Sequence, residues 1–190
     1  MCPSGTDPYL NHVAWSPCAT KFLTLFHYHS RTDGSRRIYP VIVDLLNENY
    51  KLLSESGIFS HHTWIDSNKL LAYLKLSNRL TFAVWDELNG WQPINVSLPT
   101  ADGHPTYIAK SDSIIVDSYP DRLGRMSLYH GNLHNRCSPS KFGMIRNYPR
   151  YINELRCDLH PRVTGCNNYI VCDVPMKSGR KILVINNNLT

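Results

Sequence analysis

The chain has 190 residues, a formal net charge of +5, and ordinary shares of hydrophobic (42%) and charged (18%) residues. These proportions exclude a disordered chain and leave enough residues for a sizeable core. Lysine and arginine are scattered rather than clustered, so no nucleic-acid partner is expected. No apolar run is long enough for a membrane span and the N-terminus has no apolar leader, so we expect a cytoplasmic protein.

One sequence pattern recurs four times, and each copy opens with a histidine: His12, His61, His104 and His160. In every copy a large apolar residue lies three positions after the histidine, and a short polar turn leads to an apolar run. The runs cover residues 22–26, 70–74, 114–116 and 169–172. This pattern predicts a strand, a turn and a second strand in each copy.

A second block follows in each copy, at residues 37–44, 79–86, 125–132 and 180–187. Each block begins with arginine and ends with an Asx residue, namely Asp44, Asp86, Asn132 and Asn187. An Asx side chain can bond the backbone two residues further on, so these positions predict turns. Residues 50–53 and 94–97 predict short outer strands.

The histidines are spaced by 49, 43 and 56 residues, which is the length of a propeller blade of four strands. The chain is therefore predicted to be an all-β β-propeller of about four blades, in one domain over residues 1–190. The expected blades are residues 10–56, 57–100, 101–155 and 156–190. The fourth lacks an outer strand, so either the segment before His12 supplies it or the chain is part of a larger ring. We favour a partial propeller.

The repeated histidine is a candidate channel residue, because the innermost strand of each blade faces the central channel. A structural histidine inherited from one ancestral blade is the alternative. Neutral imidazoles that converge on an axis bind Mn, Fe, Zn, Ni or Cu. Asp158 lies two residues before His160 and therefore on the same face of an extended chain. The predicted metal ligands are His61, His104, Asp158 and His160.

Six cysteines are present, and their spacing fits neither a CxxC pair nor a zinc ribbon. We therefore expect reduced thiols, partly buried, at Cys2, Cys18, Cys137, Cys157, Cys166 and Cys172.

Four short segments resemble the oligogalacturonate lyase family of propellers and a group of proteins related to it. They are Ser60-His61-His62-Thr63-Trp64, Asp102-Gly103-His104-Pro105, Asp117-Ser118-Tyr119-Pro120-Asp121 and Arg156-Cys157-Asp158-Leu159-His160-Pro161. The resemblance covers residues 9–187, roughly the C-terminal half of a family member. It implies a seven-bladed propeller that holds Mn²⁺ on channel histidines and cleaves pectic oligosaccharides by β-elimination.

The resemblance also implies site residues. His61 matches a metal histidine of the family, and His160 matches the second histidine of a family His-Pro-His-Pro segment. Asp158 replaces the first histidine of that segment, and Leu155 stands where the lyases carry a glutamine ligand. These departures leave two functions open. One is a metal-dependent lyase that acts on an acidic oligosaccharide, and the other is a non-catalytic propeller that binds a carbohydrate or protein partner.

The lyase hypothesis assigns two further roles by position. A neutral histidine is a suitable base near pH 7, and His12 or His104 could serve. Arg156 or Arg162 could pair with the uronate carboxylate and stabilise the enolate-like charge that forms there. No organic cofactor is expected.

Overall fold

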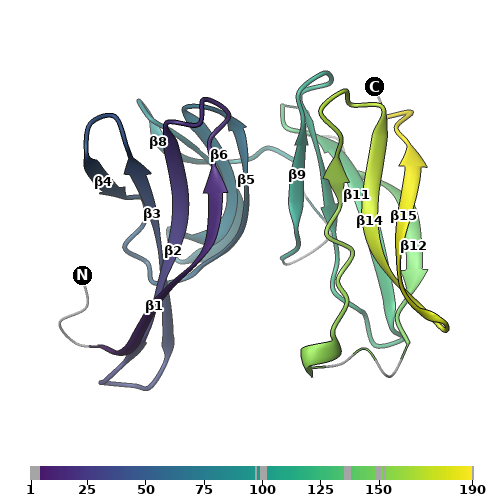
Figure 1. Ribbon diagram of the computed structural model, residues 1–190, viewed down its shortest axis with the longest axis horizontal. Coiled ribbons are helices and arrows are strands. Elements are labelled where there is room, and N and C mark those ends of the chain that lie inside the picture. Colours follow the sequence, from purple (N-terminus) through teal and green to yellow (C-terminus); the bar gives the residue numbers. More distant parts are fainter. Residues whose placement is uncertain are drawn as a thin grey trace. The chain divides into compact units, whose positions relative to one another are not determined.

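The computed structural model describes residues 5–96, 98, 102–134, 138–148, 151 and 153–189. Over these residues the chain is almost entirely β, with one 3₁₀ turn, η1 (Asn153–Leu155). Its strands form four antiparallel sheets that follow one another along the chain (Figure 1). In each sheet the strands pair in chain order, which is the strand order of a propeller blade. The predicted all-β fold with four blades is confirmed.

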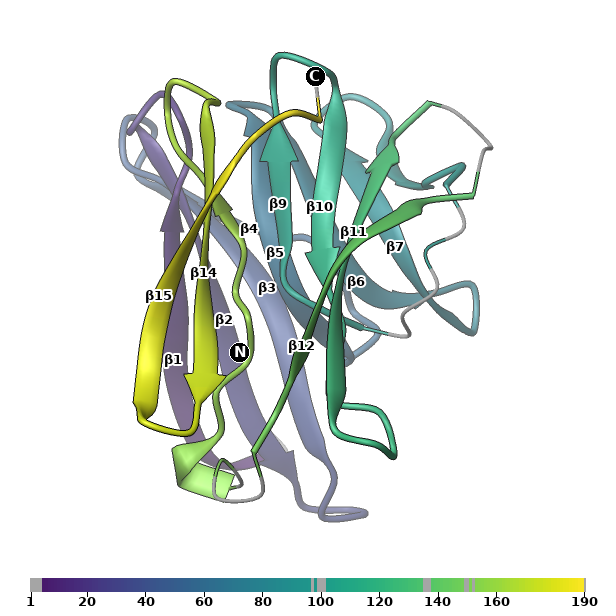
Figure 2. The same cartoon turned by 90° about the vertical axis from the view of Figure 1, so that its right-hand side faces the viewer.

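The strand bounds are as follows. The first blade holds β1 (Gly5–Trp15), β2 (Lys21–Ser30), β3 (Arg36–Asp44) and β4 (Asn49–Leu52). The second holds β5 (Phe59–Asp66), β6 (Lys69–Leu76), β7 (Arg79–Asp86) and β8 (Gly90–Pro93). The third holds β9 (Pro105–Ile108), β10 (Ser113–Asp117), β11 (Arg125–Asn132) and β12 (Ser140–Arg146), which are labelled side by side in Figure 2. The fourth holds β13 (Arg162–Val163), β14 (Tyr169–Met176) and β15 (Gly179–Asn186).

The predicted Asx turns are present in all four blades. In each one the side-chain oxygen accepts the backbone N–H two residues further on. The pairs are Asp44 with Leu46 (3.0 Å), Asp86 with Leu88 (2.9 Å), Asn132 with His134 (2.9 Å) and Asn187 with Leu189 (3.2 Å). Local side-chain chemistry therefore ends the third strand of each blade in the same way.

The chain divides into two compact units. Unit 1 consists of residues 1–60 and 64–92 and contains the first two blades, apart from residues 61–63 and Pro93. Its core joins alternate apolar residues of the two sheets, with Leu23, Leu25 and Ile42 from the first blade and Leu70 and Trp85 from the second. This alternation is what a strand produces when one face packs against the neighbouring sheet.

Unit 2 contains residues 61–63 and 93–190, and therefore the third and fourth blades. Its core joins Ile115 and Met126 of the third blade to Ile170, Cys172 and Val174 of the fourth. The segment 61–63 carries His61, so the three later repeat histidines all lie in this unit. His12 lies on β1 in unit 1.

Three details differ from the predictions. The outer strand expected at residues 94–97 is instead β8 (Gly90–Pro93), and Ser97 lies outside the described residues. Residues 5–11, which precede His12, belong to β1, and this strand pairs with β2 in the first blade. The fourth blade also has a shifted register: Lys21 pairs with Asp44, but Tyr169 pairs with Asn186 rather than with Asn187.

Four of the six cysteines are described, and none of these four forms a disulfide. Cys157 and Cys172 are buried, and Cys18 and Cys166 are exposed. Cys2 and Cys137 lie outside the described residues. Among the described residues, no helix has the length and apolar character needed to cross a membrane.

Candidate functional site

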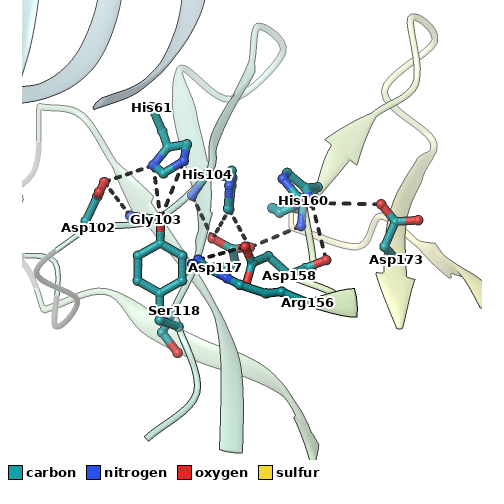
Figure 3. A network of polar contacts seen from close by, with 12 residues as sticks. His61, Asp102, Gly103, His104, Asp117, Ser118, Arg156, Asp158, His160 and Asp173 are labelled. Carbon is teal, nitrogen blue, oxygen red and sulfur yellow. Dashed lines mark hydrogen bonds and ion pairs between the residues drawn. The ribbon is translucent and has the colours of Figure 1, made fainter. Parts of the chain in front are cut away.

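Three of the four repeat histidines come together in unit 2 (Figure 3). The ring of His104 lies between the other two, with centroids 3.9 Å from His61 and 3.8 Å from His160. His61 is on β5, His104 immediately precedes β9, and His160 lies two residues before β13. The repeat therefore brings the same residue type to one point from three successive blades.

Asp117, at the end of β10, holds two of these histidines in place. Its side chain is fully buried and its oxygens accept the backbone N–H groups of His104 (2.6 Å) and His160 (3.1 Å). The Nδ1 atom of His104 lies 3.1 and 3.0 Å from the two oxygens. Burial alone would raise the pKa of Asp117, but the hydrogen bonds and charge of His104 outweigh it and lower the pKa below its usual value.

An ionised Asp117 can only accept hydrogen bonds, so Nδ1 of His104 carries the proton. The Nε2 atom of His104 is then left with a lone pair. A carboxylate behind an imidazole in this way orients the ring and raises its basicity as a ligand, as is usual in metal sites. The sequence did not identify Asp117 as a site residue. Two signals pointed to it: Asp117 ends a largely apolar strand, and it opens one of the four segments that resemble the lyase family.

Gly103 has no side chain, which allows its backbone to lie against that of Asp117 and brings the next residue, His104, to the Asp117 carboxylate. A Cβ atom at Gly103 would overlap the backbone oxygen of Asp117 and would lie 2.9 Å from Cγ1 of Val116. The backbone N–H of Gly103 also donates to Asp102 Oδ1 at 2.8 Å. The same oxygen is 3.1 Å from Nδ1 of His61. His61 and His104 are thus each backed by a carboxylate.

Asp158 approaches the cluster from the fourth blade and is bound by Arg156. The Nε and Nη2 atoms of Arg156 each lie 2.8 Å from one carboxylate oxygen of Asp158. The hydrogen bond to Asp158 raises the pKa of Arg156. The guanidinium also lies 4.3 Å from the ring centroid of Tyr119, a cation–π contact. Burial, followed by the charge of Asp102, raises the pKa of Tyr119 to about 12.

His104, Asp158 and His160 each offer one ligand atom, and these atoms lie within 4.8 Å of one another. Burial, followed by the neighbouring His104, lowers the pKa of His160, which favours the neutral ring that a metal requires. Two imidazoles and one carboxylate form a donor set suited to Mn²⁺, Fe²⁺ or Zn²⁺. The described residues therefore fit a divalent ion, and its presence stays a prediction. His61 contacts His104 but is not one of the three.

Two other predicted site residues belong to other parts of the chain. His12 belongs to unit 1, where it has a left-handed backbone conformation (φ 54°) at an irregularity of the β1–β2 pairing. Arg162 is exposed on β13, and its guanidinium donates to the carbonyl of Pro161 (3.2 Å). Leu155, at the position of the family glutamine, is exposed on η1. The roles proposed for His12 and Arg162 stay predictions.

Comparison with known proteins gives the fold of this chain but no family. A scan against protein-family models and a search of curated proteins each found no match. Among solved structures, the chain is similar to TolB from Acinetobacter baumannii, with a TM-score of 0.62 and 10% identity. That match covers 95% of this chain and 52% of TolB, so the chain spans about half the length of TolB.

Two other solved structures align with lower TM-scores. One is the β-propeller domain of the Trilobed protease from Pyrococcus furiosus, with a TM-score of 0.48, 11% identity, and coverage of 97% of this chain and 70% of that one. The other is an acylaminoacyl peptidase from Pyrococcus horikoshii, with a TM-score of 0.47, 13% identity, and coverage of 96% and 38%. The similarity to TolB shows that this chain has a β-propeller fold.

Proposed function

We propose that the chain is a metal-binding propeller that acts on acidic oligosaccharides, in the manner of the oligogalacturonate lyases that its sequence resembles. The observation that carries the proposal is the meeting of His104, Asp158 and His160, with Asp117 behind His104. His104 and Asp158 are buried and His160 is partly exposed, and the polar atoms of the two buried side chains lose hydration that a bound ion would offset. Mn²⁺ is the favoured ion, on the resemblance.

The bound ion would neutralise the carboxylate of a uronate sugar and the enolate-like charge that develops beside it. Since His104 and His160 are ligands in this scheme, His61 is the remaining imidazole of the cluster. Nδ1 of His61 lies 3.1 Å from Asp102 Oδ1, and with the proton on Nδ1 the basic nitrogen of the ring is Nε2. We therefore assign His61 the role of base, in place of the metal role expected from the sequence.

The proposed reaction is a β-elimination. His61 removes the proton on the carbon next to the uronate carboxylate. The electron pair of that C–H bond forms a carbon–carbon double bond, the glycosidic C–O bond breaks, and the leaving oxygen takes a proton from water. The hydroxyl oxygen of Tyr119 lies 3.5 Å from each ring nitrogen of His61 and helps to position the ring. The raised pKa of Tyr119 keeps this hydroxyl protonated.

The test measures metal content and lyase activity in the same samples. The purified chain should bind one Mn²⁺, and unsaturated uronate should appear as a rise in ultraviolet absorbance with oligogalacturonides. His160→Ala should lose both, and His61→Ala should lose activity but keep the metal. His134→Ala is the matched control, since His134 is exposed and bonds Asp112 (2.6 Å), away from the cluster. A chain that binds no divalent ion would overturn the proposal.

A second candidate is a non-catalytic propeller that binds a carbohydrate or protein partner. The Arg156–Asp158 pair favours it over the lyase, because an arginine that already bonds a carboxylate of the chain is not available to stabilise an enolate-like charge on a uronate. In this case Mn²⁺ and the oligosaccharide bind, measured by calorimetry, but the absorbance does not rise. Binding without elimination would select this function over the lyase.

A further inference from the structure

The arginine that opens the second block of each repeat has a different partner in the fourth blade. In the first and third blades this arginine bonds an aspartate four residues before it, within its own turn. The pairs are Arg37 with Asp33 and Arg125 with Asp121, both at 2.8 Å. In the fourth blade the residue four places before Arg180 is Met176, which carries no charge. Arg180 therefore has no aspartate at that position, and its guanidinium contacts another segment.

The segment that Arg180 contacts leads directly to the candidate metal ligands. The Nη2 atom of Arg180 donates to the backbone oxygens of Leu155 and Arg156, each at 2.7 Å. These carbonyls lie at the end of η1, and the last carbonyl groups of a helical turn have no partner within the turn. One guanidinium nitrogen carries two N–H bonds and can therefore satisfy both carbonyls.

The hairpin that carries Arg180 holds the same segment at a second point. The hydroxyl of Tyr151 donates to the backbone oxygen of Met176 at 3.1 Å. Met176 and Arg180 both belong to the end of the β14–β15 hairpin, where Arg180 pairs with Pro175. The hairpin end therefore bonds the chain before η1, through Tyr151, and at the end of η1, through Arg180.

Arg156 links this contact to a candidate metal ligand (Figure 3). Arg180 binds the backbone oxygen of Arg156, and the side chain of Arg156 binds both carboxylate oxygens of Asp158. After Asp158 the chain is fixed in another way, because Leu159 is fully buried and its carbonyl accepts the N–H of Asp173 at 2.8 Å. Arg180 therefore acts on the side of the chain that precedes Asp158.

We propose that Arg180 is a positioning residue, which fixes Arg156 and through it orients the Asp158 carboxylate of the metal site. Residues outside the ligand set that orient a ligand commonly strengthen metal binding. The inference rests on the proposed function, because the divalent ion is what this carboxylate would bind. Arg180 touches neither the ion nor the substrate, so its loss should weaken metal binding and leave the ligand set unchanged.

The test compares the affinity for Mn²⁺ of the wild-type chain, Arg180→Ala and Arg125→Ala, measured by calorimetry. Arg125 is the matched control, because it occupies the same repeat position in the same unit but bonds its own turn. We expect about tenfold weaker binding in Arg180→Ala and no change in Arg125→Ala. Urea unfolding measures the stability of both variants. An equal change in affinity in the two variants would overturn the inference.

Two further measurements distinguish a positioning role from a contribution to stability alone. Free guanidinium at millimolar concentration should recover Mn²⁺ affinity in Arg180→Ala, because the ion can occupy the place of the lost side chain. Arg156→Ala should also weaken binding, and adding Arg180→Ala to it should cause little further loss, since Arg180 acts through Arg156. Two losses that simply multiply would show that Arg180 acts by another route and would contradict the inference.

A measurement that needs no metal separates this inference from the proposed function. The Nε–H of Arg156 donates to Asp158 Oδ1 at 2.8 Å, so its NMR signal should exchange slowly with water in the metal-free chain. This protection should be lost in Arg180→Ala and kept in Arg125→Ala. The same pattern in a chain that binds no Mn²⁺ would overturn the proposed function and still support the positioning of Arg156 by Arg180. Unchanged protection in Arg180→Ala would refute the inference itself.

Discussion

Substitution of Asp117 by asparagine tests whether this buried carboxylate organises the cluster. Asp117 accepts three N–H groups, the backbone amides of His104 and His160 and the Nδ1–H of His104. Asparagine presents one acceptor oxygen and an NH₂ group, so at least one of these buried donors loses its partner. A hydrogen bond to a charged group contributes about 1.5–3 kcal/mol, so we expect Asp117→Asn to lower the free energy of unfolding by about 3 kcal/mol.

The assay is urea unfolding followed by far-ultraviolet circular dichroism. Fluorescence alone is unsuitable, because all four tryptophans, Trp15, Trp64, Trp85 and Trp91, lie in unit 1. Asp121→Asn makes the same change at an exposed turn residue, and its effect should be much smaller. The Asp117 variant should also bind Mn²⁺ more weakly than the Asp121 variant. Equal stability and equal metal affinity in the two variants would refute this account of Asp117.

Three other predictions concern single groups. Burial lowers the pKa of His27 to about 4. The unfolded chain therefore binds this proton at a higher pH than the folded chain, and the stability of unit 1 should fall as pH decreases from about 6.5 towards 4. The His27 ring, followed by NMR, should titrate near 4. Hydrogen bonds from Ser16 lower the pKa of Cys18 to about 6, so iodoacetamide at pH 7 should label Cys18 well before the buried Cys172. Gly103→Ala should cost about 1–3 kcal/mol in a denaturant titration, because its Cβ overlaps the Asp117 backbone.

For each of these three predictions, one experimental result would contradict it. An NMR pKa of His27 near 6.5 would remove the proposed pH dependence of unit 1. Equal labelling of Cys18 and Cys172 in the folded chain would show that neither thiol has the environment described. A Gly103→Ala variant with unchanged stability would show that the backbone of Asp117 can move away at no cost.

The repeat was predictable because its signals are local. The turns at Asp44 and Asp86 depend on a side chain that bonds the backbone two residues on, and an apolar run next to such a turn predicts a strand. The shifted register of the fourth blade was not predictable in the same way. Asn187 makes the expected turn, but the β14–β15 ladder ends one residue earlier, at Asn186.

The candidate site was predictable only in part. The three histidines shared one repeat position, and the spacing of Asp158 and His160 placed them on one face. Asp117 lay in a quoted segment but received no role, because its partners His104 and His160 lie 13 and 43 residues away in the sequence and reach it only through tertiary packing. The pairing of Arg156 with Asp158 was also missed. No pattern of residue types distinguishes an arginine that meets a substrate from one that bonds a carboxylate two positions away.

The most direct test of the central claim is pulsed electron paramagnetic resonance of the chain loaded with Mn²⁺. If His104 and His160 are ligands, the spectrum should contain couplings to imidazole nitrogen. These couplings should weaken in His104→Ala and in His160→Ala, and they should remain in His61→Ala and in His134→Ala. A spectrum of fully hydrated Mn²⁺ for the wild-type chain, without nitrogen coupling, would contradict the proposed metal centre.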